Sequence, residues 1–190
     1  MMKEFGQFRS LAPTEGSESL NLSFWPGTVP LQQRWRNNGL SADFLGDYVT
    51  TFFPLDDNDP TTRARQTEIR GAVSYIANEL LENAMKFHDR TLSEPINISL
   101  HLDQDRIVFQ ESNGASAEAT ERYRLYIERL DASDPNELYL QQLEENALSD
   151  SSAGLGYLTM INDYNAELAW RFEPATDGCF RVHSQVTLKI

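Results

Sequence analysis

A long amphipathic pattern between Ala64 and Asp89 is the feature that most constrains how this chain can fold. Apolar residues recur there every three or four positions, which is the spacing of one face of an α-helix. These apolar residues are Ile69, Val73, Ile76, Leu80, Ala84 and Phe87. The pattern predicts one long helix that carries an apolar stripe along one side.

Alternation of apolar and polar residues predicts strands before and after this helix. The expected strands are residues 20–24, 95–102, 105–112, 167–174 and 179–190. All but the first are expected to pair into antiparallel hairpins, which turn at residues 103–105 and at Asp177-Gly178. Helices and hairpins in this order predict an α+β fold. We expect a two-layer sandwich, in which helices cover one face of a mixed, mostly antiparallel sheet of about five strands.

Residues 1–63 are expected to form an N-terminal extension on or near a main domain of residues 64–190. Residues 1–19 lack periodicity, so we expect them to be a mobile lead-in. Residues 31–53 predict one broken helix or two short ones, because Asn38-Gly39 is a natural helix stop. The extension could serve as a dimer interface, as a docking element for a partner or as an extra layer on the sheet.

Acidic residues outnumber lysine and arginine in this chain, 29 against 16, so its formal net charge is -13. Such a surface repels phosphate backbones and anionic membranes, so neither nucleic acid nor a membrane is an expected partner. An anionic nucleotide could still bind where backbone N–H groups, a lysine and a divalent cation reverse the local field. No apolar run approaches the roughly 20 residues that cross a bilayer, and the single cysteine, Cys179, cannot form an internal disulfide. These features predict a cytoplasmic protein.

Polar residues form a line along one side of the predicted long helix. Glu79, Glu82, Asn83 and Lys86 are spaced at i, i+3, i+4 and i+7, so they are neighbours in space beside the apolar stripe. One interpretation is a solvated helix face with a Glu82 to Lys86 ion pair, worth about 0.3 to 0.5 kcal/mol. The other is a binding or catalytic site.

A polar segment and a glycine loop supply the second feature. Residues 113–154 predict one or two exposed helices, interrupted at Asp134-Pro135, that lead into the loop. Gly154, Leu155 and Gly156 then precede a predicted helix. Glycines let the backbone approach an anion, and the first N–H groups of a helix favour phosphate. An ordinary glycine loop before a helix is the alternative.

The order of these features resembles the histidine-kinase-like ATPases, the superfamily of gyrase, Hsp90, histidine kinases and MutL. ELLENAMKF on a long helix, two strands, a polar helical segment and AGLGYL before a helix carry the resemblance, over about residues 65–190. Within this superfamily, the chain is most similar in size to the stand-alone anti-sigma regulatory factor serine/threonine kinases. The SiaB-like branch of these kinases is one candidate. The resemblance implies an ATP site bounded by a helix, a lid and the sheet.

The resemblance also implies roles for single residues. Glu79 matches the N-box glutamate, a general base for the hydroxyl that attacks the γ-phosphate. Asn83 matches the asparagine whose amide oxygen helps to hold Mg2+. Lys86 matches a position that often faces the phosphates, and the Gly154–Gly156 loop matches the G2 box, whose N–H groups cradle the triphosphate. ATP, as substrate or ligand, and Mg2+ are the implied cofactors.

One segment departs from the family pattern. The G1 box has an aspartate followed by glycines directly after a strand, and the aspartate accepts a hydrogen bond from the adenine amino group. The equivalent segment here is VFQESNGAS, in which the D-x-G-x-G pattern is absent. Glu111 could replace the aspartate, or Asn113 could offer its amide oxygen. Adenine recognition is therefore in question, although phosphate binding is not.

The sequence predicts a regulatory protein kinase that uses Mg-ATP. By the resemblance, its substrate is a Ser or Thr of a small STAS-domain protein of the anti-sigma-factor-antagonist type. Such a kinase works in a partner-switching pathway, in which a PP2C-type phosphatase can reverse the reaction. The alternative is a non-catalytic interaction module, a degenerate ATPase fold that regulates a partner by binding alone. The altered G1 segment favours the alternative, and the retained Glu79 favours the kinase.

Overall fold

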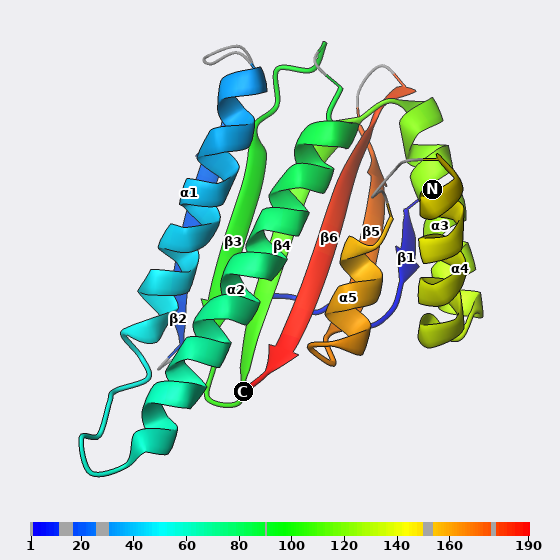
Figure 1. Cartoon of the computed structure of the whole chain (residues 1–190). Coiled ribbons are helices and arrows are strands. Elements are labelled where there is room, and N and C mark those ends of the chain that lie inside the picture. Colours follow the sequence, from blue (N-terminus) through cyan, green and yellow to red (C-terminus); the bar gives the residue numbers. More distant parts are fainter. Residues whose placement is uncertain (1, 12–16, 26–30, 90, 150–153, 176–177) are drawn as a thin grey trace.

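The computed structural model describes residues 2–11, 17–25, 31–89, 91–149, 154–175 and 178–190; for residues 31–37 and 149 it describes the backbone only. The described strands form one six-stranded sheet in the order β1-β5-β6-β4-β3-β2, and every pair is antiparallel (Figure 1). Their bounds are β1 (Lys3–Phe5), β2 (Glu18–Phe24), β3 (Ile96–Leu102), β4 (Arg106–Ala115), β5 (Glu167–Pro174) and β6 (Phe180–Lys189). The predicted α+β sandwich is confirmed, with six strands instead of about five.

The additional strand is β1, which lies in the segment expected to be a mobile lead-in. Lys3 pairs with Phe172 and Phe5 pairs with Trp170, at the edge of the sheet next to β5. That prediction was wrong because a strand of three residues is too short to show alternation. Its hydrogen-bonding partners come from the far end of the chain.

Helices cover one face of the sheet. Helices α1, α2 and α5 lie across this face, and α3 and α4 lie toward the β1 edge (Figure 1). Their bounds are α1 (Leu31–Thr50), α2 (Pro60–Phe87), α3 (Ala117–Ala132), α4 (Pro135–Ser149) and α5 (Gly156–Asn162). None of the described helices is both long and apolar enough to cross a membrane.

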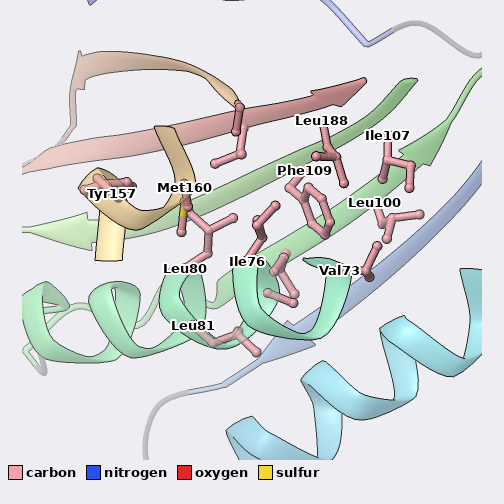
Figure 2. Packing of buried hydrophobic residues seen from close by; sticks show 14 of the residues in the cluster. Val73, Ile76, Leu80, Leu81, Leu100, Ile107, Phe109, Tyr157, Met160 and Leu188 are labelled. Atoms are coloured by element: carbon pink, nitrogen blue, oxygen red, sulfur yellow. The ribbon is translucent and has the colours of Figure 1, made fainter. Parts of the chain in front are cut away.

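Helix α2 is the predicted long helix. It begins after the N-cap Asp59, whose side chain accepts a hydrogen bond of 2.9 Å from the Thr61 backbone N–H, and Pro60 occupies the first helical position. Its apolar stripe is buried against the sheet. In Figure 2, side chains of this stripe point toward those of β3, β4 and β6 and toward Met160 of α5. This packing holds the polar side of α2 beside α5.

Helix α1 is continuous, so the expected break at Asn38-Gly39 is wrong. Its inner face packs against α2 at Gly46, where an added Cβ would collide with the Ser74 hydroxyl. Leu45 and Val49 are fully buried beside it. A glycine within a helix costs about 1 kcal/mol relative to alanine, and burial of this face outweighs that cost at Gly39.

The N-terminal segment also lies against the rear face of the sheet, the face without helices (Figure 1). Gln185 of β6 holds it there, because its side chain accepts a hydrogen bond of 2.8 Å from the Arg9 N–H and donates one of 2.9 Å to the Arg9 carbonyl. The guanidinium of Arg171 lies 4.1 Å from the centre of the Phe8 ring. The division of the chain at residue 63 stays a prediction, but β1 and β2 form opposite edges of the shared sheet.

Candidate functional site

The predicted polar line on α2 lies beside the first turn of α5. Glu79, Glu82 and Asn83 are half-buried, and Lys86 is exposed near the end of the helix. Glu82 accepts a hydrogen bond of 3.0 Å from the Asn78 amide, and the Lys86 ammonium lies 5.4 Å from the centre of the Phe87 ring. The described salt bridges include none between Glu82 and Lys86. The ion pair of the solvated-face interpretation is therefore missing from this structure.

The two separate motifs meet at Glu79 and Gly156. A Cβ added at Gly156 would lie 3.0 Å from Cδ of Glu79 and would overlap its Oε2. Real side chains do not approach so closely, so only glycine allows this carboxylate to lie against the start of α5. The structure thus brings the polar line of α2 and the glycine loop together, as the sequence hypothesis requires.

The glycine loop is held from its other side by α3 and α4. Gly154 has a φ of 83°, a left-handed backbone conformation that residues other than glycine rarely adopt. The Tyr126 hydroxyl of α3 donates a hydrogen bond of 2.9 Å to the Gly154 carbonyl. A Cβ at Gly154 would lie 3.3 Å from the Gln142 side chain of α4. Leu155 is half-buried at the N-cap position of α5, and its carbonyl accepts a bond of 2.8 Å from Thr159.

The environment of Glu79 makes its carboxylate a better proton acceptor. Burial raises the pKa of Glu79 above its ordinary value, and the negative charge of Glu82 raises it further. Tyr75, one turn earlier on α2, hydrogen-bonds to Thr159 of α5, and its pKa is raised chiefly by burial. A carboxylate with a raised pKa transfers protons more readily near neutral pH. Sequence reasoning missed Tyr75, although it lies one helical turn before Glu79.

Asn83 lies one turn after Glu79 on the same helix. Its half-buried amide makes no hydrogen bond with any side chain or backbone group that the structure describes, so its oxygen can accept a ligand. Among the described residues, no group of three or more His, Cys, Asp or Glu could hold a metal ion. A cation at this site would therefore depend on the Asn83 oxygen together with oxygens of the ligand.

Glu111 and Asn113 lie within one strand, which continues past the predicted end at residue 112 to Ala115. Both belong to β4, where Glu111 pairs with Ser184 and Asn113 pairs with Val182 of β6, on the face that the helices cover. Glu111 is 2% exposed, and its Oε1 has no hydrogen-bond partner. Burial raises the pKa of Glu111 well above its ordinary value, and the hydrogen bond from Ser184 opposes this shift.

A cluster of aromatic side chains covers Glu111. The hydroxyls of Tyr123 on α3 and Tyr157 on α5 hydrogen-bond to one another, and each also bonds to the Ser184 hydroxyl opposite Glu111. Trp170 donates a hydrogen bond of 3.2 Å to the Tyr123 hydroxyl. The Phe87 ring of α2 stacks on Tyr123, with ring centres 5.1 Å apart. We define these four rings, Phe87, Tyr123, Tyr157 and Trp170, as the aromatic cluster.

Sequence reasoning missed the aromatic cluster. Tyr157 follows a glycine that the sequence singled out, and Tyr123 lies in the segment predicted to form exposed helices, yet neither spacing nor composition indicates that their hydroxyls would meet. Tyr157 follows Gly156 directly, so the cluster adjoins the contact between Glu79 and Gly156. Asn113 lies near the end of β4, and its side-chain amide donates a hydrogen bond of 3.3 Å to the Gly114 carbonyl. That carbonyl also accepts a bond of 2.8 Å from Asp89, which follows α2.

Comparison with solved structures identifies a similar fold. The chain is similar to a chain in the crystal structure of the SiaB-SiaC complex from Pseudomonas aeruginosa, with a TM-score of 0.56 and 16% sequence identity. The alignment covers 90% of this chain and 89% of that chain. The likeness shows a shared fold. No protein-family model and no curated protein matches the sequence.

Proposed function

We propose that this chain binds Mg-ATP between α2 and the glycine loop and phosphorylates a Ser or Thr of a partner protein. The contact of Glu79 with Gly156 supports this proposal more than any other observation. It places a half-buried carboxylate of raised pKa directly beside a backbone turn that can approach phosphate. A helix face that only contacts solvent has no need for this arrangement.

Glu79 is the proposed general base. Its carboxylate accepts the proton of the substrate hydroxyl while the hydroxyl oxygen bonds to the γ-phosphorus, and the bond between that phosphorus and ADP breaks. Asn83 offers its amide oxygen to Mg2+, which when bound neutralises phosphate charge. Lys86 is exposed near the end of α2, and in this proposal its ammonium attracts the phosphates. The Gly154–Gly156 loop offers backbone N–H groups on the opposite side.

The base end of the expected ATP site fits less well than the phosphate end. A nucleobase could reach Glu111 only if Tyr123 and Tyr157 moved, because their hydroxyls bond to Ser184 beside it. This observation favours a second candidate function, in which the chain regulates a partner by binding alone. In that case the aromatic cluster is a permanent part of the core, and Glu79 has no reaction to perform.

The partner class is also a proposal. The similar solved chain comes from a complex of SiaB and SiaC, which supports a protein partner for this chain too. We propose a small STAS-type protein as the phosphate acceptor in a partner-switching pathway, with a PP2C-type phosphatase opposing the kinase. The acidic surface, with its net charge of -13, makes nucleic acid a poor partner.

The test is a calorimetric titration of ATP with Mg2+ into the wild type and into Asn83→Ala. Asn136→Ala is the matched control, because Asn136 is an exposed asparagine on α4, outside the site. We expect binding by the wild type and by the control, and at least tenfold weaker binding by Asn83→Ala. Glu79→Gln should keep nucleotide binding and lose phosphate transfer to a STAS-domain substrate. If the wild type does not bind millimolar ATP, the kinase proposal fails and binding alone becomes the better account.

A further inference from the structure

The proposed nucleotide site has an accessible phosphate end and a closed base end. At the phosphate end, Asn83 is half-buried, and Lys86 and Gly154 are exposed. At the base end lie the two residues that the sequence suggests for base recognition. Both are almost fully covered, because Glu111 is 2% exposed and Asn113 is 3% exposed. A ligand therefore meets accessible groups at the first end and covered groups at the second.

The hydroxyls of Tyr123 and Tyr157 close the base end. Both tyrosines are buried, and their hydroxyls hydrogen-bond to one another. Each hydroxyl also bonds to Ser184, which is the cross-strand partner of Glu111 on the neighbouring strand β6. The Trp170 N–H donates a further hydrogen bond of 3.2 Å to the Tyr123 hydroxyl. The polar atoms of both tyrosines are thus bonded to each other and to the sheet.

The rings of the same two tyrosines are packed on several sides. Tyr123 stacks on Phe87 of α2, with ring centres 5.1 Å apart, and meets Phe172 of β5 edge-on at 6.1 Å. Tyr157 meets Trp170 edge-on at 5.3 Å. Stacked and edge-to-face arrangements are the favourable ones for aromatic pairs. The space that a base would need is therefore filled by side chains of the protein.

The carboxyl group of Glu111 does not require a ligand to complete this environment. Its Oε1 has no hydrogen-bond partner among the described groups, but burial raises the pKa of Glu111 well above its ordinary value. A raised pKa favours the neutral acid. A neutral carboxyl group loses far less free energy on burial than a carboxylate does. The tyrosines can therefore remain over Glu111.

Entry of a base would disrupt more contacts than it could form. A base beside Glu111 would break the hydrogen bonds of both tyrosine hydroxyls and displace their packed rings. The Trp170 N–H would also lose its acceptor, and a buried donor without a partner is costly. In return, a carboxyl group can form about two hydrogen bonds with one edge of a base. This comparison favours a base that stays outside the aromatic cluster.

We propose that Tyr123 and Tyr157 make this a triphosphate site that does not read the base. Its ligand class is a magnesium-bound triphosphate, attached to adenosine, to another nucleoside or to no nucleoside at all. The inference rests on the proposed function, because Asn83, Lys86 and the Gly154–Gly156 loop hold the phosphates in both. It replaces the expected adenine contact on β4 with exclusion of the base.

Calorimetric titration of the full chain with Mg-ATP, Mg-GTP, Mg-CTP and magnesium tripolyphosphate tests base exclusion. The three nucleotides should have dissociation constants within about threefold of one another, and tripolyphosphate should bind within about tenfold of them. Asn83→Ala should weaken all four ligands at least about tenfold, whereas Asn136→Ala on exposed α4 should weaken none. ATP that binds about tenfold more tightly than GTP and CTP would overturn base exclusion and leave the proposed kinase intact. If neither ATP nor tripolyphosphate binds at millimolar concentration, both proposals fail.

The NMR signal of the Trp170 indole N–H reports whether the base end opens. This N–H donates to the Tyr123 hydroxyl, so its signal should move in Tyr123→Phe, and Trp170→Phe identifies the signal. Saturating Mg-ATP should shift the backbone amide signal of Gly156 and leave the Trp170 indole signal at its original position. A Trp170 signal that moves toward its Tyr123→Phe position when ATP is added would show that the base enters, and base exclusion would be wrong.

Discussion

Replacing Gly156 by alanine tests the contact on which the proposed site depends. The new methyl carbon would lie 3.0 Å from Cδ of Glu79 and still nearer to its Oε2, so the half-buried carboxylate must move or α5 must shift. The backbone itself would accept alanine, because Gly156 is not among the glycines with a positive φ. Any penalty therefore comes from the collision between two side chains.

The size of the penalty follows from two opposing effects. Overpacking a filled interior costs about 1 to 3 kcal/mol, whereas alanine is preferred to glycine in a helix by up to about 1 kcal/mol. Because the Glu79 side chain is flexible and can partly move aside, we expect Gly156→Ala to lower the free energy of unfolding by up to about 2 kcal/mol. When Glu79 is also alanine the collision disappears, so Gly156→Ala should then be neutral or stabilising. The two changes should show a coupling energy of about 1 to 3 kcal/mol.

Urea unfolding of the wild type, both single variants and the double variant measures this coupling. Gly71→Ala on α2 is the matched control, because an added Cβ there meets no atom within 4 Å. It should stabilise the protein by up to about 1 kcal/mol with or without Glu79. If Gly156→Ala has the same effect in both backgrounds, Glu79 does not lie against Gly156, and the geometric basis of the proposed site is refuted.

Three further predictions concern the buried polar groups and the helix cap. Because burial raises the folded-state pKa of Glu111 well above its ordinary value of 4.5, its ionisation weakens the fold as the pH rises above that value. Glu111→Gln should therefore be more stable than wild type at pH 7 by thermal melting, with a difference that shrinks toward pH 4.5; an unchanged difference would contradict burial of a charged group. Tyr123→Phe removes the hydroxyl that accepts from the Trp170 N–H and bonds to Tyr157 and Ser184, and it should cost about 1 to 3 kcal/mol in urea unfolding. Asp59→Ala removes the cap on the Thr61 N–H and should lower the melting temperature, which helix content measured by circular dichroism during melting can check.

Short-range patterns were sufficient to predict much of the fold. The periodicity in residues 64–89 predicted α2, and alternation predicted the hairpins of β3 with β4 and β5 with β6. These elements are long enough for their apolar faces to be visible in the sequence. The continuity of α1 was not visible, because Gly39 and its neighbours favour a stop, and only packing against α2 at Gly46 explains why the helix continues.

The candidate site was predictable in its parts but not in its environment. Residue types and spacing on α2, together with two glycines, indicated phosphate chemistry. The same residue types and spacings did not indicate that tyrosines from α3 and α5 would enclose Glu111. This enclosure depends on how those two helices pack relative to β4. Residues 113–115, expected to begin a helical segment, continue the buried strand β4 instead.

By itself the sequence determined the type of most elements and the side of each that is buried, because those properties depend on residues close together along the chain. Tertiary structure alone decided which distant residues meet. β1 pairs with β5 from the other end of the chain, and Glu79 lies against Gly156 only because α2 and α5 pack on the same sheet. Such contacts depend on how whole faces fill space together, and no local spacing encodes that result.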